Sequence, residues 1–224
     1  MEQEWRPIRI DRPVQLLVEG KDPENFFEKF ITRLELKGTQ VQNFRGVDEL
    51  KGFLEGFVVA PGFGQVKSIG IVRDAERRMD RVERVETQPS SAASAFQSVQ
   101  SSLRNVGLPV PNRPTEEAGT EPAVSVFILP GNEDDGMLET LLCRTFAETD
   151  MDRCVDGFFQ CVAESGSRIH RPDKARARAY LTTMPHPHVS VGVAAQKGYW
   201  DFDHEALDGV RRFLMALAQD RPAA

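Results

Sequence analysis

Three acidic residues stand where two apolar segments of the sequence end. Glu19 follows the apolar run at residues 14–18, and Asp74 and Glu76 follow a second run at residues 66–72. In an extended chain the i, i+2 spacing of Asp74 and Glu76 directs both carboxylates toward one side. Carboxylates brought together repel one another unless a cation joins them, and hard oxygen ligands suit Mg²⁺ or Mn²⁺. The pattern indicates a divalent-cation site, with solvated strand-end acids as the structural alternative.

The elements that must position these acids alternate between strands and helices. Short apolar runs predict strands at residues 14–18, 39–44, 66–72 and 124–130. Apolar residues at helical spacing predict the intervening helices at residues 23–36, 47–59, 90–107 and 136–146. This alternation implies an α/β fold with a mainly parallel four-stranded sheet flanked by helices. Ligands of such sheets collect outside the carboxyl ends of the strands, so the three acids are expected to converge there.

The pattern changes near residue 150. Helices without intervening strands are expected at residues 152–165, 172–184 and 203–218. We therefore expect residues 1–150 to form the α/β core and residues 151–224 to form a mostly helical C-terminal extension packed on it.

Composition narrows the class of protein. The 224 residues carry a formal net charge of −6, so any contact with nucleic acid requires a local basic surface. The N-terminus lacks a signal-peptide pattern, and no apolar run approaches the ~18 residues of a membrane span, which favours a cytoplasmic protein. No G-x-S-x-G, P-loop or H-E-x-x-H pattern supports a serine hydrolase, a nucleoside triphosphatase or a zinc protease.

Two segments carry a family resemblance. LLVEGKDPENFF at residues 16–27 and SIGIVRDAE at residues 68–76 resemble the glutamate and Asp-x-Asp motifs of the Toprim (Rossmann-like) fold of topoisomerases, bacterial primases and OLD-family nucleases. The likeness is greatest to a small bacterial group of uncharacterised Toprim-like proteins, through LPGNEDDGMLETLL and KGYWDF as well. The resemblance implies that Glu19 acts in proton transfer or metal binding and that Asp74 and Glu76 hold Mg²⁺. Glu76 stands where the usual motif has a second aspartate.

The same resemblance implies roles for two further residues. In OLD-type nucleases an acid after the fourth strand helps to bind a second metal, which implies that role for Glu139 in MLETLL. A lysine of those nucleases offsets phosphate charge, and Lys174 in the basic segment SRIHRPDKARARAY is the corresponding candidate. An exposed helix face that is merely solvated would produce the same run of charges.

Two functions are consistent with these patterns. The first is a Mg²⁺-dependent (or Mn²⁺-dependent) phosphodiester-cleaving or related phosphotransfer enzyme whose catalytic residues are Glu19 and Lys174 and whose metal ligands are Glu19, Asp74, Glu76 and Glu139. The second is a non-catalytic module that keeps the same frame and binds a nucleotide, a nucleic acid or a protein. Either could act with a separate ATPase, because the sequence has no motor motif of its own.

Overall fold

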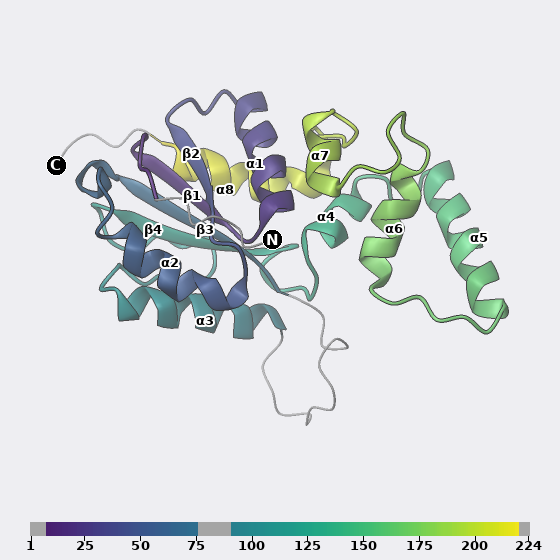
Figure 1. Cartoon of the computed structure of the whole chain (residues 1–224), viewed down its shortest axis with the longest axis horizontal. Coiled ribbons are helices and arrows are strands. Elements are labelled where there is room, and N and C mark those ends of the chain that lie inside the picture. Colours follow the sequence, from purple (N-terminus) through teal and green to yellow (C-terminus); the bar gives the residue numbers. More distant parts are fainter. Residues whose placement is uncertain (1–7, 76–90, 220–224) are drawn as a thin grey trace, which may run out of the picture.

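An all-parallel sheet lies at the centre of the molecule and carries helices on both faces (Figure 1). The computed structural model describes residues 8–75 and 91–219. The strands of the described residues are β1 (Val14–Val18), β2 (Thr39–Asn43), β3 (Ser68–Asp74) and β4 (Ala123–Leu129). They are arranged in the order β2-β1-β3-β4, with every neighbouring pair parallel. The predicted α/β class and parallel sheet are confirmed.

Alternate strand residues enter two separate hydrophobic clusters because side chains leave a strand on opposite faces. Leu16, Val18 and Phe127 belong to one cluster, and Leu17 and Val126 belong to the other. The helices that cover the first face are α1 (Lys21–Arg33) and α8 (Asp208–Leu217), and those that cover the second are α2 (Leu50–Phe57) and α3 (Ser91–Asn105). Burial on both faces explains why the central strands read as continuous apolar runs.

Four α-helices of the described residues lie between the last strand and α8. They are α4 (Leu138–Arg144), α5 (Asp150–Glu164), α6 (Pro172–Leu181) and α7 (Val191–Gln196). Short 3₁₀ turns occur at η1 (Val47–Glu49), η2 (Phe63–Gln65) and η4 (Glu205–Leu207). α4 packs against α6, and α6 packs against α5. In Figure 1, α5 forms the outer edge of the molecule. No helix of the described residues is long and apolar enough to cross a membrane.

Two C-terminal helices, α7 and α8, pack on the α/β core, and the sequence does not predict α7. α7 lies against α1, and residues of α8 share one cluster with the strands. α7 escaped prediction because its six residues, VGVAAQ, are too few to display a helical period. The end of β3 also differs from the prediction. The strand ends at Asp74, which pairs in register with Leu129, rather than at residue 72. Asp74 is therefore the final residue of the strand, not the second residue after it.

Candidate active site

Glu19 lies at the carboxyl end of β1, where the chain turns sharply into α1. Gly20 makes this turn with a φ of 91°, in the region that favours glycine. The Gly20 carbonyl then accepts a 3.2 Å hydrogen bond from the Glu24 N–H in the first turn of α1. The Glu-Gly pair thus ends the strand and leaves the carboxylate of Glu19 at the edge of the sheet.

A buried arginine stands beside Glu19. Arg73 is the next-to-last residue of β3, and its Nε lies 3.8 Å from Oε2 of Glu19. The side chains are only 7% and 15% exposed, respectively. Arg73 also donates from Nη1 to the carbonyl of Ala95 in α3, at 3.4 Å. A charge inside an apolar strand requires such partners, and here the partner is a candidate functional acid.

Asp74 is partly buried and lies within electrostatic reach of the other acids of the site. Burial raises the pKa of the Asp74 carboxyl well above its ordinary value, and the negative charges of Glu19 and Glu139 raise it further. A hydrogen bond from the Leu138 N–H to Oδ1, at 3.0 Å, and the charge of Lys174 act in the opposite direction. The charges of Glu19, Glu139 and Lys174 therefore all act on Asp74, although the four residues come from elements far apart in the sequence.

The helical side of the site consists of α4 and α6. Glu139 lies in the first turn of α4, and its Oε1 is 3.6 Å from Nζ of Lys174 on α6. The Glu139 side chain is 12% exposed, whereas the Lys174 side chain is 45% exposed. The acid is therefore held within the structure, while the ammonium group stays accessible to a ligand.

A second contact beside this ion pair fixes the two helices in register. Thr140 Oγ1 donates a hydrogen bond to the carboxylate of Asp173, so consecutive residues of α4 bind consecutive residues of α6. The same hydroxyl accepts a 3.0 Å bond from the Met137 N–H at the start of α4. Asp173 is buried, and its bond to Thr140 positions the neighbouring pair of Glu139 and Lys174.

Cys143 of α4 is buried and forms another contact with α6. Its thiol donates to the backbone carbonyl of Asp173 over 3.6 Å. Burial raises the pKa of the Cys143 thiol to about 12, and the charge of Asp173 acts in the same direction. The thiol is therefore protonated at neutral pH and serves as a hydrogen-bond donor rather than as a nucleophile.

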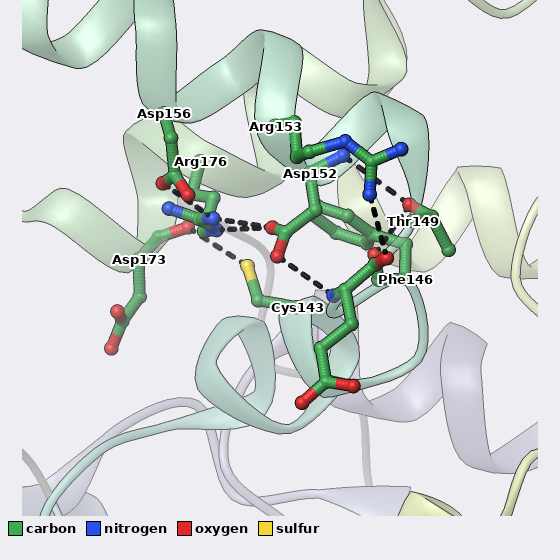
Figure 2. A network of polar contacts seen from close by, with 9 residues as sticks. Cys143, Phe146, Thr149, Asp152, Arg153, Asp156, Asp173 and Arg176 are labelled. Carbon is green, nitrogen blue, oxygen red and sulfur yellow. Dashed lines mark hydrogen bonds and ion pairs between the residues drawn. The ribbon is translucent and has the colours of Figure 1, made fainter.

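An ionic network ties α6 to α5 (Figure 2). Arg176 forms ion pairs with Asp152 and with Asp156, the latter at 2.8 Å between Nη2 and Oδ1. Asp152 also accepts a 2.9 Å bond from the Glu148 N–H before α5 begins. Burial opposes the charge of Arg176, yet the hydrogen bonds and charges of the two aspartates raise its pKa above the ordinary value.

The basic segment that the sequence singles out divides into residues with different partners. Lys174 contacts the acids of the site, whereas Arg176 binds α5 and Arg178 donates from Nη1 to the carbonyl of Val189 at 2.8 Å. Three other members of the segment are exposed to solvent: Arg168, His170 and Arg171. Only part of the charge run is therefore close to the candidate site.

The oxygen donors of the site have the chemistry that Mg²⁺ prefers. The described residues contain no group of three or more His, Cys, Asp or Glu side chains arranged to hold a metal ion. Mg²⁺, however, is commonly bound through one or two carboxylates, with waters and substrate phosphates as its other ligands. Asp74 and Glu139 fit that requirement, whereas Glu76 lies outside the described residues.

Sequence reasoning missed two side chains that hold the site together. Arg73 had a usable signal, because a charged residue inside the run SIGIVRD has to be paired when the strand is buried. Asp173 was visible only as the single acid of a basic segment. Its bond to Thr140 joins residues 33 positions apart, which no local pattern encodes.

Comparison with known proteins places the chain in a family. A family model described as "Protein of unknown function (DUF3226)" matches residues 13–219, nearly the whole chain. The chain belongs to the DUF3226 family. No curated protein matches it.

Among solved structures, this DUF3226 chain is similar to the C-terminal region of the OLD protein of Burkholderia pseudomallei. The two are 13% identical, with a TM-score of 0.45, and the match covers 93% of this chain and 100% of the other.

Proposed function

We propose that this protein is a Mg²⁺-dependent, nuclease-like enzyme that cleaves phosphodiester bonds. The observation that carries the proposal is the partly buried carboxyl of Asp74, on which the charges of Glu19 and Glu139 from two other elements act, next to the ion pair of Glu139 with the half-exposed Lys174. Such an accumulation of carboxylates is unfavourable in a partly buried place unless a cation accompanies it. The Toprim-like motifs at residues 16–27 and 68–76 support the same chemistry.

Asp74 and Glu139 would hold the metal ion, because the third acid, Glu19, is paired with the buried guanidinium of Arg73. Asp74 takes its hydrogen bond from a backbone N–H, and Glu139 pairs with the exposed Lys174, so each keeps an oxygen for a further contact. When bound, Mg²⁺ supplies positive charge to the phosphate oxygens and makes an attacking water more acidic.

The residues of the chain would share the remaining tasks. Lys174 can turn from Glu139 to a phosphate oxygen and offset its negative charge, since its side chain is 45% exposed. Glu19, held by Arg73, is placed to accept a proton from the attacking water. The water oxygen bonds to phosphorus, the bond from phosphorus to the leaving oxygen breaks, and that oxygen takes a proton from solvent.

The test is hydrolysis of labelled DNA, RNA and small nucleotides with Mg²⁺ or Mn²⁺. Asp74→Ala should lower the rate by about 100-fold or more, because it removes a proposed metal ligand. Asp134→Asn is the matched control, since Asp134 is an exposed acid that precedes α4 and pairs with Arg144 of that helix. Cleavage that survives Asp74→Ala unchanged would contradict the site assignment.

A non-catalytic binding module is the second candidate, and the Arg73–Glu19 pair favours it. A buried guanidinium 3.8 Å from the glutamate neutralises the acid and competes with a metal ion for it. Calorimetric titration with Mg²⁺, with and without a nucleotide, separates the two functions. Binding of a nucleotide without cleavage would support the module, and the absence of any Mg²⁺ binding at millimolar concentration would exclude the proposed enzyme.

A further inference from the structure

The outer face of α5 exposes an apolar stripe. Cys154, Phe158 and Cys161 recur at helical spacing, i, i+4 and i+7, on the side that faces away from α6. Phe158 is 57% exposed, and both cysteines are free and exposed. Val155 is the one buried residue of the helix. A 15-residue helix at the edge of the molecule thus contacts the protein by a single face.

We propose that this stripe, together with Gly157, binds a second copy of the same chain, with the two α5 helices antiparallel around a two-fold axis. A two-fold interface requires a surface that is complementary to itself. An axis between Gly157 and Phe158 places Cys154 of each copy opposite Cys161 of the other. It also places each Phe158 ring over Gly157 of the other copy, where an added Cβ would meet nothing within 4 Å. A large side chain then fills the space that a glycine leaves.

The charges at the two ends of α5 select the antiparallel orientation. The exposed residues where the helix begins are Glu148, Asp150 and Arg153, with one negative charge in excess, and those where it ends are Glu164, Arg168 and Arg171, with one positive charge in excess. Antiparallel pairing brings the acidic end of one copy beside the basic end of the other. Parallel pairing would bring like charges together, which disfavours it.

The contact is small, which sets the affinity to expect. At 1.5 Å per residue the helix is about 22 Å long, and one helix face on each side gives an interface at the low end of the range for specific complexes. We therefore expect a dimer that dissociates at micromolar concentration and depends strongly on its central aromatic side chain.

Sedimentation of the full chain over a range of concentrations tests the dimer. The wild type should pass from monomer to dimer, and Phe158→Asp should weaken the dimer by about tenfold or more. Met215→Asp is the matched control because Met215, on α8, is 52% exposed and lies outside the stripe. An unchanged circular dichroism spectrum establishes that the variants fold. A monomer at every concentration, or equal effects of both variants, would overturn the proposal.

Disulfide trapping with copper phenanthroline tests the register. Seven helical steps separate Cys154 from Cys161 by about 10.5 Å along the axis, beyond the ~7 Å that a disulfide spans between Cα atoms. Any rapid bond between them must therefore join two copies. The wild type should form a covalent dimer, Cys154→Ser and Cys161→Ser alone should not, and an equimolar mixture of the two variants should again form one. A covalent dimer from either single variant alone would contradict the antiparallel pairing.

Discussion

Glu19 and Asp74 lie at the ends of strands whose residues are mostly apolar, whereas Glu139 and Lys174 lie on helices that polar and charged side chains join. Leu16, Leu17 and Val18, which precede Glu19, are fully buried between two hydrophobic clusters. α6, in contrast, contributes two apolar residues of its own to the core, Ala177 and Leu181, and it meets α5 through the ion pairs of Arg176.

The difference teaches that the two sides of the site are stabilised by different forces. Apolar burial fixes the strand ends and varies little with salt or pH. On the helical side, ion pairs and charge-assisted hydrogen bonds add to the apolar contacts of α4 and α6, and their strength depends on the ionisation of both partners. Substitutions on the strand side should therefore affect the whole fold, and substitutions on the helical side should act locally.

The largest effect is expected from Leu16→Ala on β1. The Leu16 side chain is fully buried in the middle of the sheet, so truncation should lower the free energy of unfolding by about 2–5 kcal/mol. Urea denaturation measures the loss. Val59→Ala, at a residue that is 79% exposed, should change stability by less than about 0.5 kcal/mol. Similar losses of stability in the two variants would contradict the claim that apolar burial stabilises the strand side.

An intermediate and local effect is expected from Arg176→Met. This change leaves Asp152, whose side chain is 15% exposed, without its cationic partner. It should lower the free energy of unfolding by about 1–3 kcal/mol. Hydrogen exchange should quicken in α5 and α6 but not in β1, β3 or β4.

Arg153→Gln is the matched control for that prediction. Arg153 also pairs with an aspartate on α5, Asp150, but the two side chains are 69% and 92% exposed, so the loss should stay below about 1 kcal/mol. Faster exchange throughout the sheet in Arg176→Met would show that the helical side is not a separate unit.

The sequence predicts the strand side of this comparison better than the helical side. Runs such as VQLLV and AVSVFIL identify strands because both faces of each are buried. The positions of Glu19 and Asp74 can be predicted from such runs, because the end of a strand depends on local sequence. Arg73 interrupts its apolar run, and the expected end of β3 therefore fell two residues early.

Contacts between distant residues account for what could not be predicted. Leu138 donates to Asp74 across 64 positions of the chain, and Thr140 donates to Asp173 across 33. Neither bond follows from periodicity or spacing, because each depends on how α4 packs after the sheet has formed. Glu139 and Lys174 were reached through a family resemblance rather than through any pattern that places them beside Asp74.

The smallest effect, and the one that links the two sides, is expected from Asp74→Asn in metal-free buffer. Asparagine keeps an oxygen for the Leu138 N–H but removes a charge that faces Glu19 and Glu139. The pKa of Asp74 is raised in the folded protein, so the folded state binds its proton more tightly than the unfolded state. The contribution of Asp74 to wild-type stability therefore falls as pH rises from the unfolded pKa, about 3.9, through the raised folded pKa.

Asp74→Asn should accordingly raise the melting temperature at neutral pH, and the gain should disappear as pH falls below the unfolded pKa of about 3.9. The gain is limited because the wild-type carboxyl can relieve its own repulsion by taking up a proton. Thermal unfolding in EDTA across this pH range measures it, with Asp134→Asn as the control for loss of one exposed charge. If Asp74→Asn instead destabilised the protein equally at every pH, the carboxylates of the two sides would not repel one another, and the case for a cation between them would fail.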